Sequence, residues 1–588
     1  MAEKKQVNGY IKRLGKLTFT LSWISFILAI IDLGFLDDSS IDLYFILFYT
    51  FTIIASCTFT AIRYFFFRKQ IYSKILVIDG LIFIFYIGVF IYNSWLLGTE
   101  SIHSLNNTWT YLALFLSFVR ETYNINYRFK YKIINPALLF VCSFLLIIVM
   151  GSLLLMLPNA SNGTISYIDA LFTATSAVCV TGLIVVDTAT FFTPLGQTVI
   201  IFLIQIGGLG IMTFTSYFSF FFKKSASFEN QMYMGEITSV DRLDDVFKTL
   251  KTIIVVTFTI ELIGAIFIFF SMDAGTLPKV GNRIFFSIFH SISAFCNAGF
   301  STLTNGLYEL PFRFNYPFQL IISFLIIFGG IGFSITFNIY KYFVYKITNT
   351  FKKIFRQREK TYLPWILSLN SKIIITTTTV LIVVGILLVF FLERDNTLIE
   401  HGLFGKIVIA FSTAVTPRTA GFNSVDFAQL SLPVTLIVII LMWIGASPGS
   451  TGGGIKTSTF AISVLNIISL AKGKKNLVVF SREISQNSIN RAFAIISLSM
   501  GVLFLAILGL VISDGDKNLI DIVFESFSAY STVGLSRGIT ASLSTGGKII
   551  VTLTMFLGRI STLTLLVALV KKARTANFRY PEDKILIN

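Results

Sequence analysis

FSTAVTPRTAGF, at residues 411–422, shares its outline with three other stretches of this chain: FTATSAVCVTGL at 172–183, FHSISAFCNAGF at 289–300 and FESFSAYSTVGL at 524–535. In each stretch a phenylalanine precedes a glycine by ten residues, and one bulky apolar residue follows the glycine. The four glycines are separated by 117, 122 and 113 residues. Such regular spacing indicates an internal repeat rather than four independent turns.

Two long apolar runs flank each of these stretches. A helix needs about 20 apolar residues to cross the hydrocarbon of a membrane, and segments of roughly 10 to 14 residues are better suited to re-entrant helices. The long runs therefore predict membrane spans, and the short stretches predict helices that enter the membrane and return. The pairs of long runs lie at 136–157 and 196–222, 249–271 and 318–345, 371–392 and 432–470, and 491–512 and 547–570.

The composition excludes an ordinary soluble protein. Of the 588 residues, 54% are hydrophobic and 13% are charged, whereas soluble domains average roughly 25% charged residues. The net charge of +17 lies in loops between apolar runs: residues 341–360 are strongly basic, while 393–400 and 514–521 are mainly acidic. This alternation is typical of a multi-pass membrane protein with basic loops in the cytoplasm, and we expect no nucleic-acid partner.

Four further apolar runs precede the repeats and predict about four additional spans in an N-terminal block, residues 1–135. Basic loops at 63–74 and 120–132 follow the second and fourth of these runs, which predicts a cytoplasmic N-terminus and, with the spans that follow, a cytoplasmic C-terminus. The sequence leaves the role of the block open between a dimer contact, a regulator and an anchor. The four runs lie at 17–36, 43–66, 75–97 and 108–120.

The sequence contains little catalytic or metal-binding chemistry. Its four cysteines lie inside apolar runs without metal-ligand spacing, which argues against a disulfide framework. Three histidines are too few for a multi-histidine metal site, and His290 is expected at the start of a short helix as a packing or capping residue. No nucleophile is patterned with a base, and no carboxylate pair stands out. We therefore expect neither an enzyme nor a cofactor bound by this chain.

The repeated unit has a known physical use. A helix that stops halfway through the bilayer points its partially negative C-terminal end at the membrane centre. The chain can return only where its non-helical backbone is shielded by protein or lines a water-filled cavity. Four such units around one axis would form a cation pore, and glycine permits the backbone angles that turn successive carbonyl groups toward that axis.

On these stretches, and above all on TAVTPRTAGFNSVD at 413–426, the chain resembles the Trk/Ktr/HKT superfamily of K⁺ transporters, in the branch of bacterial Trk and Ktr membrane subunits. The resemblance covers about 136–588. It implies an all-α polytopic membrane protein with four fused M1–pore helix–M2 repeats around a central pore. The repeats would be residues 136–245, 246–360, 361–485 and 486–588.

The resemblance also implies a selectivity filter that binds K⁺ through backbone carbonyl groups. Family members that admit Na⁺ often have serine at the first filter glycine, so Gly182 favours K⁺. Asn297 and Thr532 leave mixed Na⁺/K⁺ conduction, or Na⁺-coupled K⁺ transport, open as an alternative. A membrane enzyme is a second alternative, but the fourfold glycine register would then have no purpose. The implied filter residues are Val180, Thr181, Gly182, Leu183, Asn297, Ala298, Gly299, Phe300, Thr419, Ala420, Gly421, Phe422, Thr532, Val533, Gly534 and Leu535.

The second long run of the third repeat contains GASPGSTGGGIKT at 445–457, and its glycines and proline predict a break in the helix. A phosphate-binding loop is excluded because Ile455 separates Gly454 from Lys456, so the G-x-x-x-x-G-K-[ST] pattern fails by one residue. In the family the matching segment is an intramembrane gating loop. The resemblance therefore implies a gate that includes Gly449, Gly452, Gly453 and Gly454.

Charged residues inside apolar runs are functional-site hypotheses. Arg559 lies too deep in its run to reach either membrane surface, and the resemblance places it in the cavity beside the gate; an ion pair that holds helices together is the alternative. For Glu261 we expect helix packing with Gly264 before any ion-handling role. In the N-terminal block, Asp32, Asp79 and Arg120 are candidates to pair with one another.

The resemblance implies that K⁺ moves down its electrochemical gradient into the cell, across the plasma (inner) membrane, through this chain as the membrane subunit. It further implies a homodimer. A TrkA/KtrA-like cytosolic nucleotide-binding regulatory subunit would dock on the basic loops and on residues 571–588, and the nucleotide would be bound by that partner.

Overall fold

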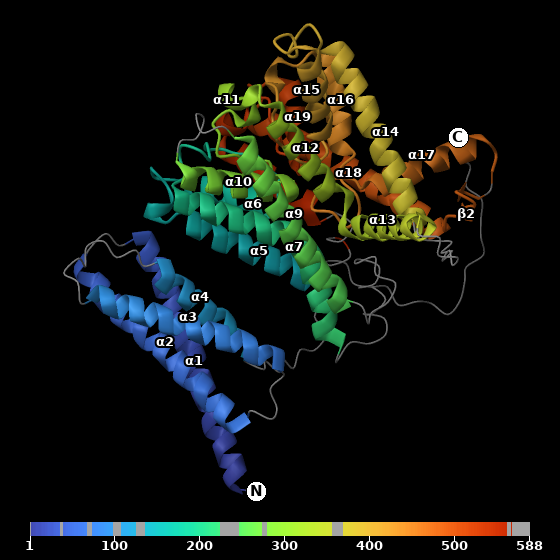
Figure 1. Cartoon of the computed structure of the whole chain (residues 1–588). Helices are drawn as coiled ribbons and strands as arrows, with labels where there is room; N and C mark the ends of the chain where they lie inside the picture. Colours follow the sequence, from blue (N-terminus) through green and yellow to red (C-terminus); the bar gives the residue numbers. More distant parts are fainter. Residues whose placement is uncertain are drawn as a thin grey trace. The chain divides into compact units, whose positions relative to one another are not determined.

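The computed structural model is almost entirely helical over the residues that it describes (Figure 1). Its contacts divide the chain into two units, Met1–Ile133 with Leu157–Asn159, and Ile134–Met156 with Ala160–Asn588. The described residues are 2–35, 39–67, 73–97, 108–124, 136–223, 246–272, 279–354, 368–474, 476–560 and 566.

The first unit contains a helix at each of the four predicted N-terminal runs. Their bounds are α1 (Ala2–Phe35), α2 (Ser39–Phe67), α3 (Ser73–Leu97) and α4 (Thr108–Asn124).

Polar side chains inside this first unit are paired. Arg120 forms a buried ion pair with Asp79 at 3.0 Å, as the sequence suggested. Asp32 instead accepts hydrogen bonds from the hydroxyl groups of Tyr49 (3.1 Å) and Tyr111 (2.8 Å). The expectation that all three charged residues pair with one another is therefore wrong for Asp32, because two tyrosines on neighbouring helices satisfy its carboxylate.

The second unit alternates long and short helices. Short 3₁₀ turns follow three of the repeated stretches, at Gly306–Tyr308, Phe427–Gln429 and Thr540–Ser542. The helices are α5 (Pro136–Leu155), α6 (Tyr167–Val178), α7 (Pro194–Lys223), α9 (Val246–Ser271), α10 (Val280–Phe295), α11 (Leu310–Arg313), α12 (Tyr316–Ile331), α13 (Phe333–Ile354), α14 (Leu369–Leu392), α15 (Leu403–Val415), α16 (Leu432–Trp443), α17 (Thr457–Ala471), α18 (Gln486–Ser513), α19 (Leu519–Tyr530) and α20 (Thr545–Ile560).

Within the residues that the structure describes, four helical segments are long and apolar enough to cross a membrane: Gly15–Phe35, Lys251–Ser271, Leu369–Leu392 and Gln486–Ser513. Several shorter apolar helices accompany them. The long helices expose large apolar side chains, and Phe270 in α9, for example, is 78% exposed. Such surfaces suit lipid rather than water. The chain is a multi-pass membrane protein.

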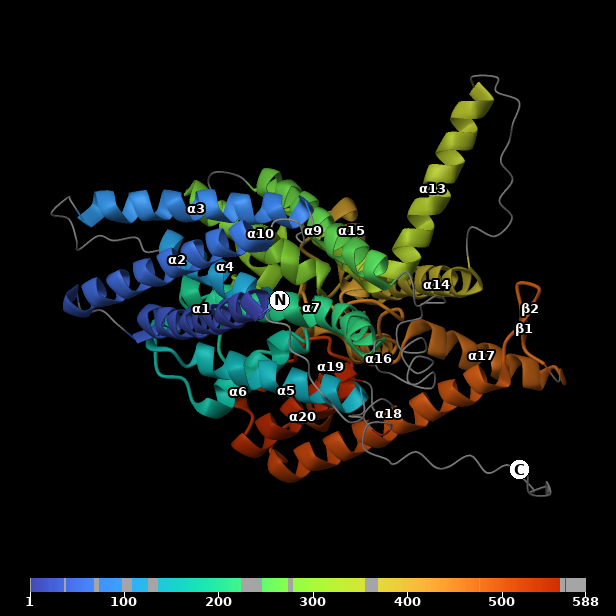
Figure 2. The same cartoon turned by 90° about the horizontal axis from the view of Figure 1, so that it is seen from below.

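Within the second unit, each short helix packs on two neighbouring longer helices, and the series of helix contacts leads back from the last helix to the first short one. The short helix α6 packs on α5 and α7, α10 on α9 and α12, α15 on α12 and α14, and α19 on α18 and α20. The last helix, α20, packs in turn on α6, and an ion pair of 2.6 Å between Lys548 and Asp169 joins them. Figure 2 shows α17 beside α18, to which it connects through the hairpin of β1 (Val478–Val479) and β2 (Arg482–Glu483).

Two of the predicted long runs are interrupted. The run 432–470 ends as α16 at Trp443 and resumes as α17 at Thr457, as its glycine and proline residues predict. The run 318–345 was predicted to be continuous, which is wrong, because Gly332 with φ of 90° separates α12 from α13. The end of the run 547–570 lies largely outside the described residues, which include α20 to Ile560 and then residue 566.

Candidate functional site

The four short helices α6, α10, α15 and α19 end shortly before the repeated glycines. They contain 12, 16, 13 and 12 residues. Each begins before the phenylalanine that opens its stretch, so His290 lies inside α10 and not at its start. It is fully buried and bonds to the Phe286 carbonyl and the Ser301 hydroxyl, both at 2.9 Å. The expected packing role of His290 is confirmed, whereas its expected position was wrong.

The chain leaves each short helix through two left-handed residues separated by one residue. The second is the repeated glycine, but the first is not glycine, and such a conformation costs on the order of 1–3 kcal/mol in a non-glycine residue. Backbone strain repeated at four equivalent positions points to a functional constraint rather than to chance. The φ angles are 56° and 93° at Val180 and Gly182, 60° and 71° at Asn297 and Gly299, 70° and 76° at Thr419 and Gly421, and 50° and 91° at Thr532 and Gly534.

The amide groups of these segments are bound by their own helices. The N–H of the residue before each glycine donates to a helix carbonyl four or five residues earlier, at 2.7 Å for Thr181 and Ala298, 3.0 Å for Ala420 and 2.8 Å for Val533. Within the described part of the chain, no hydrogen-bond donor reaches the carbonyl oxygens of these four residues. The segments therefore bind the scaffold through their N–H groups and leave these carbonyl groups available for a cation.

The four segments meet backbone to backbone in cyclic order. A Cβ atom added to Gly299 would lie 2.8 Å from the Ala420 carbonyl oxygen, closer than real Cβ atoms approach. Each of the other repeated glycines faces the next segment in the same way, and the fourth closes on the first. The contacts are Gly182 with Ala298, Gly299 with Ala420, Gly421 with Val533, and Gly534 with Thr181.

The residues that follow the repeated glycines differ from the residues that precede them, because two of them have carbonyl groups that accept hydrogen bonds. The carbonyl group of Phe300 accepts a hydrogen bond of 2.7 Å from Ser293 of α10, and that of Phe422 accepts one of 2.7 Å from Thr416, the residue that directly follows α15. These two carbonyls, which the sequence assigned to the filter, are turned toward the scaffold. The side chains of Leu183, Phe300, Phe422 and Leu535 are all buried.

The loop between α16 and α17, residues 445–456, lies directly against the third and fourth segments. A Cβ atom on Gly452 would strike the Thr419 side chain, and one on Gly453 would lie 3.0 Å from the Thr532 methyl group. Gly449 and Gly454 are left-handed, with φ of 74° and 65°. The glycines predicted for the gate thus let this loop approach the first residues of two segments.

The junction between α12 and α13 holds the same loop from another side. The Phe333 N–H donates to the Gly449 carbonyl (3.1 Å), and the Ser447 N–H donates to the Gly330 carbonyl (3.0 Å). A Cβ atom on Gly332 would lie 2.8 Å from the Pro448 carbonyl oxygen. The sequence analysis did not identify this junction, although the GGIG stretch at 329–332 was a visible signal.

Two cations, the buried Arg559 and the partly buried Lys456, bind the carbonyl groups of this loop. Arg559, only 4% exposed, donates to the carbonyls of Thr451 and, at 2.8 Å, Gly207 of α7. The Lys456 ammonium group donates to the Gly452 carbonyl at 2.6 Å and more weakly to that of Gly453 at 3.4 Å. Arg559 was expected beside the loop. Lys456 was considered only in excluding a phosphate-binding loop, and its role here was missed.

Residues 115–580 match the TrkH family, which is described as a cation transport protein. The chain belongs to the TrkH family of cation transport proteins. It is 38% identical over 460 residues to the Ktr system potassium uptake protein B of Bacillus subtilis (strain 168), with 78% of this chain and 97% of the relative covered. It is 34% identical over 466 residues to the potassium/sodium uptake protein NtpJ of Enterococcus hirae, with 78% and 98% covered.

A solved structure has the same fold as this chain. The crystal structure of the potassium transporter TrkH from Vibrio parahaemolyticus matches with a TM-score of 0.59 at 19% identity, covering 78% of this chain and 90% of that one. The resemblance drawn from the repeated stretches is thereby confirmed, and this TrkH-family chain is a transporter and not an enzyme. The family match begins at residue 115, so most of the first unit lies outside it.

Behind the second segment of this TrkH-family protein lies a buried carboxylate. Glu261 accepts from the Gln205 amide (3.2 Å) and the Cys296 thiol (3.7 Å), and its carbonyl accepts from Ser291 (2.6 Å). Gly264, one turn later, faces the Ser291 hydroxyl. These contacts support the expected role in helix packing. The described residues contain no cluster of three or more histidine, cysteine or acidic side chains that could hold a metal ion.

Proposed function

We propose that this chain takes up K⁺ across the plasma (inner) membrane through a gated pore built from four M1–pore helix–M2 repeats. The cyclic contact of the four glycine segments is the observation that supports this most, because it brings four sets of free carbonyl groups to one place. Rings of carbonyl oxygens replace the hydration shell of a cation in K⁺ channel filters. The repeats are residues 136–245, 246–360, 361–485 and 486–588.

The filter in this proposal consists of the four segments that follow the short helices. The carbonyls of Thr181, Ala298, Ala420 and Val533 are the strongest candidates to bind K⁺, since their N–H groups are tied to the scaffold. Phe300 and Phe422 keep a packing role, because their carbonyl groups bond to side-chain hydroxyl groups.

K⁺ preference over Na⁺ rests on a glycine at each repeated position. Mixed Na⁺/K⁺ conduction, or Na⁺-coupled K⁺ transport, is the second candidate, since one relative is named a potassium/sodium uptake protein. Fluxes of K⁺, Rb⁺ and Na⁺ into proteoliposomes containing the purified chain distinguish the two. K⁺ and Rb⁺ uptake with little Na⁺ uptake is expected. Comparable Na⁺ entry would support the second candidate, and Na⁺-dependent K⁺ entry would indicate coupling.

The gate in this proposal is the loop at 445–456, which includes Gly449, Gly452, Gly453 and Gly454, together with Arg559. Its contact with Thr419 and Thr532 and the two cations on its carbonyls support an obstruction next to the filter. Removing residues 449–453 should raise K⁺ flux without changing ion preference, because the filter carbonyls belong to other segments. A folded deletion variant with unchanged or lower flux would contradict the gate.

One relative is named as a protein of a Ktr uptake system, which supports an assembly with further system proteins. We propose a homodimer with a TrkA/KtrA-like cytosolic nucleotide-binding regulatory subunit, cytoplasmic termini, and α1–α4 as an N-terminal transmembrane block, residues 1–135. K⁺ is the transported ion, and no cofactor is assigned to this chain. The mass of the purified complex in detergent, measured with and without the regulatory subunit, tests both partners.

A further inference from the structure

The chain just beyond the fourth glycine is tied back to its short helix by a buried carboxylate. Glu525 of α19 is fully buried and accepts hydrogen bonds from the hydroxyl groups of Ser536 (2.8 Å) and Thr540 (2.5 Å). The N–H of Gly534 donates to the Ser528 hydroxyl of the same helix at 3.1 Å. The fourth segment is therefore attached to α19 both at its glycine and two residues later.

Arg537, three residues after the fourth glycine, joins this segment to the third repeat. Its Nε forms a 2.6 Å ion pair with Asp521 of α19. Its terminal nitrogens donate to the carbonyls of Phe427 (3.0 Å) and Ala428 (3.2 Å) and to the hydroxyl of Thr435 (3.1 Å). The two carbonyls belong to the 3₁₀ turn after the third segment, and Thr435 belongs to α16. The planar fork of arginine can direct several N–H donors at such a set of acceptors, which a lysine ammonium group cannot.

The residue three places after the glycine differs among the four segments: it is Val185, Thr302, Ser424 or Arg537. Ser424 is buried and donates to the side-chain oxygen of Gln319 at 2.9 Å. Gln319 is the fourth residue of α12, and Thr435 is the fourth residue of α16. Ser424 and Arg537 therefore bind equivalent positions of the preceding repeat, through a neutral hydrogen bond in one case and a charged group in the other.

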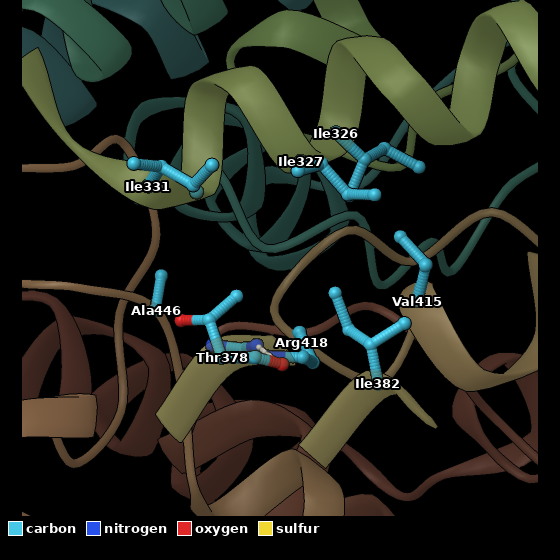
Figure 3. Close-up of a pocket in the computed structure, with 9 residues that line it drawn as sticks. Ile326, Ile327, Ile331, Thr378, Ile382, Val415, Arg418 and Ala446 are labelled. Atoms are coloured by element: carbon cyan, nitrogen blue, oxygen red, sulfur yellow. Dashed lines mark hydrogen bonds between the residues drawn. The ribbon is translucent and has the colours of Figure 1, made fainter. Parts of the chain in front are cut away.

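Arg418, which directly precedes the third segment, makes contacts of a different kind. Figure 3 shows it beside Thr378, among aliphatic side chains. Its terminal nitrogens lie 3.4 Å from the Thr378 carbonyl and 3.5 Å from the Gly445 carbonyl. Both carbonyls belong to the same repeat as Arg418. These long contacts therefore do not join two repeats, whereas the shorter contacts of Arg537 do.

We propose that Arg537 is a positioning residue for ion selectivity, because it holds the fourth filter segment at a fixed separation from the third. The inference rests on the proposed function, since the two segments meet where Gly421 faces the Val533 carbonyl, one of the carbonyls assigned to K⁺. A clamp across this contact keeps the carbonyl oxygens from closing around the smaller Na⁺. Asp521 compensates the charge of Arg537, so the role is to fix a distance and not to repel cations.

Relative K⁺ and Na⁺ fluxes in proteoliposomes test this role, because their ratio does not depend on how much folded protein is inserted. Arg537→Gln should lower the preference for K⁺ by about threefold, since a displaced segment loses part of its fit to K⁺. Lys548→Gln is the matched control and should keep the preference. It removes another 2.6 Å ion pair of similar burial, to Asp169 of the first repeat, but Lys548 lies on α20 and not beside a filter glycine. An unchanged preference in Arg537→Gln, or an equal fall in both variants, would overturn the proposal.

Two further variants separate positioning from charge. Arg537→Lys keeps the charge but not the fork, so its preference for K⁺ should stay close to that of Arg537→Gln. Recovery to the wild-type value would overturn the positioning role. Thr435→Val removes one acceptor from the third repeat, so it should lower the preference by less than Arg537→Gln does and add little to that variant. Full additivity of the two changes would show that they act independently and would contradict the clamp.

Gly182→Ser, measured in the same assay, distinguishes this inference from the proposed function. We expect both Gly182→Ser and Arg537→Gln to lower the preference for K⁺. If only Gly182→Ser lowers it, the filter stands and the positioning role of Arg537 fails. If neither variant changes it, the proposed filter itself fails.

Discussion

The four glycine segments and the loop at 445–456 are both non-helical backbone inside a helical unit, but they are held in different ways. Thr181 bonds to Ser176, five residues earlier in its own helix. The loop bonds to partners far away in the sequence, such as Arg559, which is 108 residues from Thr451. Movement of α12, α13 or α20 would therefore displace the loop while leaving the segments attached to their short helices.

The largest expected effect comes from breaking the glycine segments. Gly182→Ser would place a side chain on a residue with φ of 93° and against the Ala298 carbonyl. The preference for K⁺ over Na⁺ should fall by about tenfold, or about 1.4 kcal/mol, in proteoliposome flux assays. Gly281→Ser is the control, since that exposed helical glycine has nothing within 4 Å of its Cβ position. Unchanged ion preference in Gly182→Ser would remove Gly182 from the filter.

The next effect concerns the charge that binds the loop. Arg559→Gln should raise K⁺ uptake several-fold, on the order of tenfold for about 1.4 kcal/mol of barrier, because a buried positive charge near the pathway repels cations. Arg559→Lys should stay near wild type if charge alone matters. Thermal stability measured beside flux separates this from a structural role. A purely structural Arg559 predicts slower and less stable variants.

A smaller effect is expected at the junction that positions the loop. Gly332→Ala would force an alanine into φ of 90° against the Pro448 carbonyl and weaken the attachment of the loop. Basal K⁺ flux should rise about two- to threefold, for roughly half a kcal/mol, with unchanged ion preference. Gly473→Ala is a matched control, because its φ of 65° imposes similar strain with nothing within 4 Å of its Cβ position. Equal flux changes in both variants would show that the junction between α12 and α13 does not control the position of the loop.

The smallest effect on transport is expected outside both regions, where Asp514 at the end of α18 bonds to Ser544 just before α20. Burial raises the pKa of Asp514, but hydrogen bonds from Ser513 and Ser544 outweigh it, so the pKa lies below its ordinary value. The lowered pKa stabilises the fold above the unfolded pKa of about 3.9, and this contribution is lost as the pH falls through the folded value.

Asp514→Asn should therefore destabilise the protein near neutral pH by about 1–3 kcal/mol, and the difference from wild type should shrink as the pH falls below about 4. Unfolding midpoints across this range measure it, while ion preference and flux should not change. The more exposed Asp516→Asn is the control. A pH-independent difference for Asp514→Asn would contradict the assigned carboxylate bonds.

Much of this protein could be predicted because its signals are local. Apolar length predicts spans, and a glycine ten residues after a phenylalanine predicts a short helix followed by a left-handed turn. The break between Trp443 and Thr457 follows from the glycine and proline residues of its own segment. Helix starts were less predictable. The sequence analysis expected the second short helix to begin near His290, whereas α10 begins at Val280, nine residues before Phe289.

The sequence by itself determined the four glycine segments, the interrupted helix of the third repeat and the membrane setting, because backbone angles and apolar length depend on residues close together in the chain. Only the tertiary structure decided that the glycine segments meet in cyclic order, that Gly332 meets Pro448, and that Arg559 donates to the carbonyls of both Thr451 and Gly207. These features depend on contacts between residues tens to hundreds of positions apart, and the geometry of such contacts is fixed only when the helices pack.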